Sequence, residues 1–124
     1  LRSVTDVSLS KLAAAIDKNH RSLTQLVLEF KRNTNIDGEG LVDLANAIEN
    51  LKDLETLNVN FDLSPIVSNE GFQQLVTNLE QLPKFKSLSL SFSQCEKISV
   101  LGFKQLAETL AALNLRELRL HFIK

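Results

Sequence analysis

The sequence predicts an α/β fold built from repeated strand–helix units, with the strands parallel in one sheet and every helix on the same side of that sheet. The first observation is a pattern, L-x-x-L-x-[LV]-x-F, that occurs at residues 23–30, 54–61, 85–92 and 115–122, with Phe in the first place of the third copy. Successive copies start 31, 31 and 30 residues apart, and the second observation is that Gly40, Gly71 and Gly102 keep step with them. A fixed period of about 30 residues is typical of a solenoid, in which each unit buries its apolar face only against its neighbours.

The third observation is a change in the spacing of apolar residues within each unit. In the first copy of the pattern, Leu26, Leu28 and Phe30 are two residues apart, as in a strand with one face against a core. The second and third copies repeat this spacing at Leu57, Val59, Phe61 and at Leu88, Leu90, Phe92. Each copy is therefore predicted to form a strand.

After each of the first three strands, the apolar spacing becomes that of a helix. Apolar residues then fall at relative positions 0, 3, 4, 7 and 10, which form one stripe along an amphipathic helix. They are Leu41, Leu44, Ala45, Ile48, Leu51; Phe72, Leu75, Val76, Leu79, Leu82; and Phe103, Leu106, Ala107, Leu110, Leu113. A fourth stripe, Leu9, Leu12, Ala13 and Ile16, precedes the first strand. Because each strand returns through a helix, the strands are predicted to be parallel, with right-handed connections.

Each strand-to-helix segment carries an apolar residue four positions before its glycine, namely Ile36, Val67 and Ile98. We expect these residues to anchor the turns, and we expect each glycine to let the helix start pass close to the sheet. The chain has no linker long enough to divide it, so residues 1–124 are predicted to form one domain of about four units. The outer face of the third helix is expected to be exposed and mostly uncharged, at Gln73, Gln74, Thr77, Asn78 and Glu80.

Composition excludes several classes of partner and location. The chain has 124 residues, 44% hydrophobic, with 14 Lys+Arg against 15 Asp+Glu, a net charge of −1. A nearly neutral protein has no overall field to draw it to nucleic acid or anionic lipid, so neither is predicted as a partner. No apolar run is long enough to cross a membrane, and a single cysteine, Cys95, with no N-x-[ST] site points to a reducing, cytoplasmic location. The start at Leu1 has no signal pattern, and a fragment of a longer array is expected.

Together these residues resemble the ribonuclease-inhibitor-like leucine-rich-repeat family, whose units read L-x-x-L-x-L, then N-x-I-x-x-x-G and a helix. The resemblance extends from about Leu9 to Phe122. It implies a horseshoe segment with the parallel sheet on its concave side and the helices on its convex side. The chain departs from the family in two ways. The expected asparagine is replaced by Thr34, Pro65 and Glu96, and the third apolar residue of each strand is Phe.

The resemblance implies that function lies on the concave strand face, where residues alternating with the core positions point. The candidate partner-binding residues on this face are Glu29, Lys31, Asn58, Asn60, Asp62, Ser89, Ser91, Arg119 and His121. Ser87, Ser89, Ser91 and Ser93 of the third strand leave a shallow, hydrogen-bonding floor between strands that carry charged residues. A partner with a protruding polar or acidic segment could lie over Ser89 and Ser91 and contact Arg119 and His121 of the last strand. A second interpretation is that these are solvated strand residues, kept short because a curved sheet crowds its inner face.

Catalytic patterns are absent from the sequence. His20 and His121 have no Cys or carboxylate at metal-ligand spacing, and Cys95 has no nearby histidine to activate it. Neither glycine-rich phosphate-binding motif occurs around Gly38 and Gly40. The sequence therefore predicts no enzyme, no cofactor and no metal site.

Three functions from different classes remain open. The first is a non-catalytic module that binds a protein partner through its concave face. The second is an architectural subunit of a large assembly, with further repeats or another subunit covering the exposed apolar side of the last strand. The third is a GTPase-activator-type regulator, as in one branch of the family, which needs an arginine or a positioning asparagine in a strand-to-helix loop that faces the nucleotide. Arg32 and Asn33 follow the first strand and would be these residues.

Overall fold

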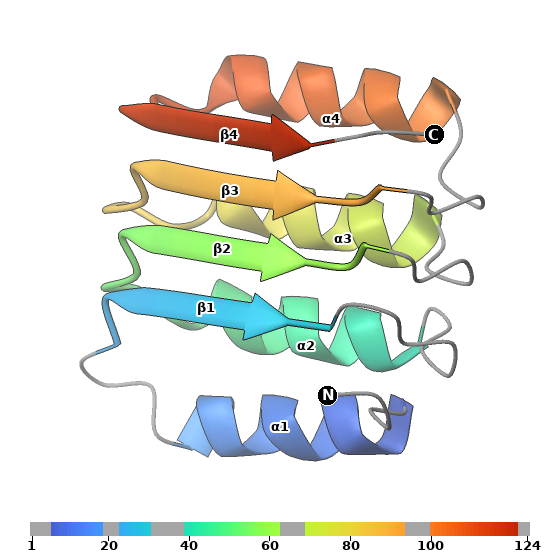
Figure 1. The fold of residues 1–124 in the computed structure, drawn as a ribbon. Coiled ribbons are helices and arrows are strands. Elements are labelled where there is room, and N and C mark those ends of the chain that lie inside the picture. The colour runs from blue at the N-terminus through green and yellow to red at the C-terminus, as the bar shows by residue number, and fades with distance from the viewer. Residues whose placement is uncertain (1–5, 19–22, 31–38, 63–68, 94–99, 122–124) are drawn as a thin grey trace.

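The computed structural model describes residues 6–18, 23–30, 39–62, 69–93 and 100–121. In these ranges helices and strands alternate along the chain (Figure 1). The helices are α1 (Asp6–Lys18), α2 (Glu39–Glu49), α3 (Asn69–Leu79) and α4 (Val100–Ala112), and the strands are β1 (Gln25–Glu29), β2 (Thr56–Asn60), β3 (Ser87–Ser91) and β4 (Glu117–His121). Every strand lies within one copy of the sequence pattern. The predicted α/β fold of alternating helices and strands is confirmed.

The strands form one parallel sheet in the order β1-β2-β3-β4. Leu26 pairs with Leu57, Leu57 with Leu88, and Leu88 with Leu118, so the register across the sheet repeats the 31-, 31- and 30-residue spacing of the sequence. Sequential neighbours are therefore also spatial neighbours. This register places equivalent residues of every unit side by side.

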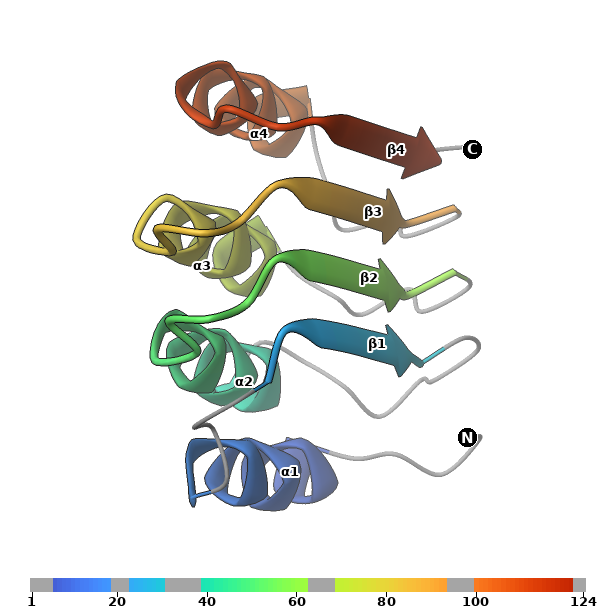
Figure 2. The same cartoon turned by 90° about the vertical axis from the view of Figure 1, so that its left-hand side faces the viewer.

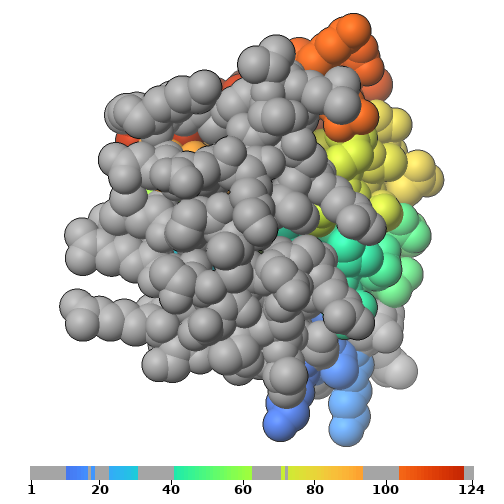
Figure 3. All heavy atoms as spheres, turned by 90° about the vertical axis from the view of Figure 1, so that its right-hand side faces the viewer, coloured from blue at the N-terminus to red at the C-terminus, as the bar shows by residue number. Residues whose placement is uncertain are grey.

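All helices cover the same face of the sheet (Figure 2). In a space-filling view their atoms are stacked in chain order, from α1 in blue at one end to α4 in orange at the other (Figure 3). Between helices and sheet lies one core, built from the alternating strand residues and the helix stripes that the sequence predicts. At its centre Leu57, Phe61 and Ile48 are fully buried. No helix of the described ranges covers the opposite sheet face, and we call it the open face.

A column of phenylalanines runs through the core at the carboxyl ends of the strands. The rings of Phe30 and Phe61 are stacked with centroids 5.3 Å apart, and those of Phe61 and Phe92 with centroids 5.4 Å apart. The backbone continues the ladder here, because Phe30 N donates to Asn60 O at 2.7 Å and Phe61 N donates to Ser91 O at 2.8 Å. Offset aromatic pairs of this kind contribute about 0.5–1.5 kcal/mol beyond the area they bury.

The contact made by Gly71 differs from the one expected from sequence. A Cβ built at this buried position in the first turn of α3 would lie 2.8 Å from Leu41 Cδ2 of α2. The glycine thus allows close approach of neighbouring helices rather than of a helix to the sheet. Gly40 and Gly102 belong to the first turns of α2 and α4, whereas Ile36, Val67 and Ile98 lie outside the described residues.

The expectation that Asn78 is exposed is wrong. Its side chain is 2% exposed, and its Nδ2 donates to the carbonyl oxygen of Ala45 in α2 at 2.8 Å, while its Oδ1 accepts from Gln74 Nε2 at 2.8 Å. Both ends of the amide are satisfied, which is what allows a polar side chain to be buried between helices. Thr77 and Glu80 are exposed as expected, and Gln73 and Gln74 are half-buried.

The last strand has the same apolar residues as the others but does not bury them. Leu118 is 44% and Leu120 is 41% exposed, whereas their register partners Leu88 and Leu90 are 2% and 1% exposed. Exposure of the apolar side of this strand is thus confirmed. The position of a leucine in the stack, and not its place in the repeat, decides how much its burial stabilises the fold.

Truncating equivalent leucines in two strands tests this difference. We expect Leu57→Ala to lower the free energy of unfolding by about 2–5 kcal/mol, because the site is fully enclosed and leaves a cavity. The matched variant Leu118→Ala is expected to cost about 1 kcal/mol or less, since nearly half of that residue is already in water. Urea unfolding followed by circular dichroism measures both values, and equal losses would contradict the observed burial.

Candidate functional site: the open face of the sheet

The strand register arranges the open face as three rows that cross the sheet. The first row is Gln25, Thr56, Ser87 and Glu117; the central row is Val27, Asn58, Ser89 and Arg119; the end row is Glu29, Asn60, Ser91 and His121. Neighbours within a row are on adjacent strands, about 4.8 Å apart. A row of this face is therefore a continuous line of side chains about 14 Å long.

The sequence-predicted site residues separate into two groups on this face. Asn58, Ser89 and Arg119 belong to the central row, and Glu29, Asn60, Ser91 and His121 belong to the end row, with Asp62 two residues beyond Asn60. All of these are brought onto one surface, as expected. Lys31, the remaining candidate, lies outside the described residues, as do His20, Arg32, Asn33 and Cys95.

A hydrogen-bonded chain joins three strands at the end row. Asp62 Oδ1 accepts from Ser91 Oγ at 2.5 Å and from the backbone N of Ser93 at 2.8 Å, and Ser91 Oγ lies 3.3 Å from His121 Nδ1. The Asn60 amide also takes part, because its Oδ1 accepts from the backbone N of Asp62 at 2.8 Å. We call Asn60, Asp62, Ser91 and His121 the end-row network.

The direction of these bonds follows from the proton inventory of each group. An ionised Asp62 can only accept, so the single hydroxyl proton of Ser91 is donated to it, and His121 Nδ1 must then donate to Ser91 Oγ. In a hydrolytic triad the histidine instead accepts the serine proton and the carboxylate orients the histidine. Here the serine stands between the other two groups. The order of groups in this chain therefore differs from that of a hydrolytic triad.

A shallow pocket of about 220 Å³ lies over the other part of the open face. It is lined by all residues of the first and central rows, together with Leu57 and Leu88. Val27, which is 57% exposed, lies at one end of the pocket. Arg119 and Glu117 lie at the other end, where Arg119 Nη2 is 4.0 Å from Glu117 Oε2. The volume is below the roughly 300–1,000 Å³ of small-molecule pockets, so it suits individual side chains of a larger ligand.

Sequence reasoning did not include Val27 or the first row among the candidate binding residues. Their alternation with core positions puts them on the open face, and this signal is present in the sequence. The sequence does not show how deep the surface is at each position along a strand, because this depth depends on the sizes of the side chains in neighbouring units. In the structure, the first and central rows line the pocket, and Asn60, Ser91 and His121 of the end row take part in the end-row network.

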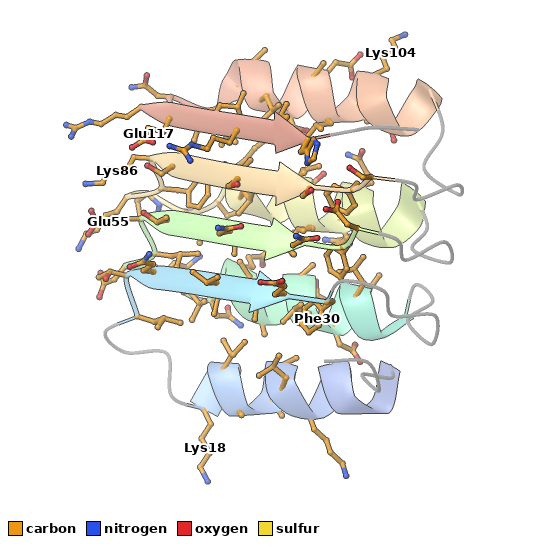
Figure 4. All side chains as sticks on the ribbon, viewed as in Figure 1. Lys18, Phe30, Glu55, Lys86, Lys104 and Glu117 are labelled. Atoms are coloured by element: carbon orange, nitrogen blue, oxygen red, sulfur yellow. The ribbon has the colours of Figure 1, made fainter. Side chains whose placement is uncertain are left out.

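Two ion pairs join consecutive units where the strands begin. Lys86 Nζ lies 2.6 Å from Glu55 Oε1, and Lys84 Nζ lies 2.8 Å from Asp53 Oδ1. Glu55 and Lys86 directly precede the first-row residues of β2 and β3, where these strands begin (Figure 4). The Lys86 ammonium, by hydrogen bond and by charge, lowers the pKa of Glu55. Asp53 in turn raises the pKa of Lys84.

Within the described ranges of the chain, no group of three or more His, Cys, Asp or Glu side chains is arranged to hold a metal ion. No helix in those ranges is both long and apolar enough to cross a bilayer.

The Glu55–Lys86 ion pair should make the stability of the fold depend on pH. Because the pKa of Glu55 is lower in the folded chain than its ordinary value of 4.5, the pair stabilises the fold above that value and loses this contribution as the pH falls through the lowered pKa. We expect Lys86→Gln to lower the midpoint of urea unfolding at pH 6 and to change it much less at pH 3. The effect should be small and weaker in high salt, because both side chains are partly exposed.

The control for this pair is Lys11→Gln, which removes an exposed lysine on α1, on a different element from Glu55. Its effect on unfolding should be the same at both values of pH. If Lys86→Gln behaves like this control, the ion pair does not cause the shift in the pKa of Glu55.

The chain was also compared with known proteins. No protein-family model matches it, and no curated protein matches it. What the chain can bind therefore has to be inferred from the open face itself: a row of small polar residues with a pocket, next to a network of fixed polar side chains.

Proposed function

We propose that this chain is part of a leucine-rich-repeat solenoid of the ribonuclease-inhibitor type and acts as a non-catalytic module that binds a protein partner through the open face of its sheet. In such a solenoid the open face is concave and the helices lie on the convex side. Support comes from the register, which stacks equivalent residues of four strands, and from helices that cover only one side. The observation that carries the proposal is the pocket in a sheet face that no helix covers.

The physical reason for a binding role is that this face is held in position by the core beneath it. On β2 and β3 each open-face residue alternates with a buried one, such as Leu57 and Val59 beside Asn58. A strand fixed in this way loses little backbone freedom when a partner binds, so the ordering cost of association is low. The end-row network adds to this by restricting the rotamers of Asp62 and Ser91 before any partner arrives.

The absence of a catalytic role is part of the same proposal. The order of groups in the end-row network, with Ser91 donating to Asp62, favours positioning over nucleophilic chemistry. A GTPase-activator role would depend on Arg32 and Asn33 and remains a prediction from sequence. A cytoplasmic location is proposed on the single cysteine of the chain.

A second candidate function is an architectural subunit of a large assembly. The exposed apolar pair Leu118 and Leu120 specifically favours it, because a neighbouring protein or a further repeat would bury them. The two candidates use different surfaces. Interaction through the open face should depend on the central row, and architectural contact should depend on β4 and the helices.

Substitution of one residue on each surface distinguishes these functions. Ser89→Arg would fill the floor of the pocket with a long charged side chain, while Thr77→Arg makes the same change on the exposed surface of α3. Each variant, and the unchanged chain, carries a photo-crosslinking amino acid at Asn58 and is used to capture partners from a lysate of its source. We expect one protein to crosslink to the unchanged chain and to Thr77→Arg, and to be reduced at least tenfold with Ser89→Arg.

The opposite pattern would overturn the proposal. If Thr77→Arg removes the captured protein while Ser89→Arg leaves it, the partner contacts the helices and the architectural role is supported instead. Urea unfolding of both variants provides the folding control, because both substitutions are at positions open to solvent. Equal midpoints show that any loss of crosslinking comes from the surface and not from the core.

A further inference from the structure

The two ends of the central row have different chemistry. Val27 on β1 is the most exposed large apolar residue of the described chain, at 57%. Arg119 on β4 is a guanidinium with a side chain 80% exposed, and its described ion-pair partner, Glu117, is 4.0 Å away, which is too long for a hydrogen bond. Asn58 and Ser89 lie between them. One line of side chains thus runs from an apolar contact to a cation.

The length of this line matches a definite number of residues in an extended peptide. Val27 and Arg119 are three strand spacings apart, which is about 14 Å. An extended chain advances about 3.3–3.4 Å per residue, so four residues cover the same distance. Side chains at positions i and i+4 of an extended chain also point to the same side. A peptide lying across the strands can therefore present both of its ends to the row at once.

The charge of Arg119 selects the group that suits its end of the row. A guanidinium can bind a carboxylate through two parallel hydrogen bonds. Arg119 does not make such a pair with Glu117, because its Nη2 lies 4.0 Å from Glu117 Oε2. Glu117 belongs to the first row, one row away, and its exposure to water weakens its repulsion of a carboxylate bound at Arg119. Between the ends, the amide of Asn58 and the hydroxyl of Ser89 can each donate and accept, so they can pair with the main chain of a peptide.

We propose that the pocket holds an extended segment of a partner protein that crosses all four strands, with an apolar side chain against Val27 and a carboxylate, four residues away, against Arg119. This inference rests on the proposed open-face interaction and specifies the part of the partner that is bound. The middle position of the segment carries a small side chain, because the pocket is shallow and its total volume is only about 220 Å³.

Selection from a displayed library of random nonapeptides tests the spacing and the charge separately. The unchanged chain is expected to enrich peptides in which Leu, Ile, Val or Met is four positions from Asp or Glu, over peptides with spacings of three or five. Arg119→Glu is expected to replace the acidic preference with Lys or Arg at the same spacing. The matched control Arg116→Glu changes the same charge outside the pocket and should keep the acidic preference.

A peptide enriched in this selection is then titrated by fluorescence polarisation. We expect Arg119→Glu to weaken its binding at least tenfold, Val27→Ser to weaken it about threefold to tenfold, and Arg116→Glu to leave it unchanged. An acidic preference that survives in Arg119→Glu, or a selection with no preferred spacing, would overturn the inference. If the spacing fails while Ser89→Arg still removes the crosslinked partner, the open face binds a protein in another way and only the proposed segment is wrong.

Discussion

The in-register stacking of equivalent residues is the constraint on which the rest of the structure depends. Phe61 is fully buried because a phenylalanine of the preceding unit lies on one side of its ring and one of the following unit lies on the other. A slip of one residue between two strands would turn every leucine and phenylalanine of one strand to the water and bring its polar residues into the core. The aromatic column and the leucine ladder both penalise such a slip, so each unit can take only one position relative to the next.

The same register produces the surface that we propose to be functional. Residues that alternate with the core are brought into rows across four strands, and each row combines side chains that are about 30 residues apart in sequence. The first and central rows line a pocket with an apolar and a cationic end, and Asn60, Ser91 and His121 of the end row form the end-row network with Asp62. Because buried leucines and a valine fix β2 and β3, the middle of the pocket and of the network lies on rigid core. The register of the strands therefore determines both how the core packs and which side chains form the proposed binding surface.

Periodicity made the fold largely predictable from sequence, because spacing of two and spacing near 3.6 are imposed by backbone geometry alone. The alternation also placed Asn58, Ser89, Arg119 and His121 on one face. What sequence did not reveal depends on contacts between units. Asn78 is buried because a carbonyl of α2 is available to its amide, and Gly71 is required by the side chain of Leu41 in a different helix. The bond from Ser91 to Asp62 and the position of the pocket depend in the same way on which side chains the register makes adjacent.

The stacking of Phe61 between its two neighbours can be tested directly by nuclear Overhauser spectroscopy on protein labelled at phenylalanine, with single Phe→Leu variants to assign the rings. With centroids 5.3 and 5.4 Å from Phe30 and Phe92, the Phe61 ring should show cross-peaks to both of these rings, and the two outer rings should show none to each other. Cross-peaks from Phe61 to open-face residues such as Asn58 or Ser89, with none to Phe30 and Phe92, would mean a different register and would contradict both the core and the proposed binding surface.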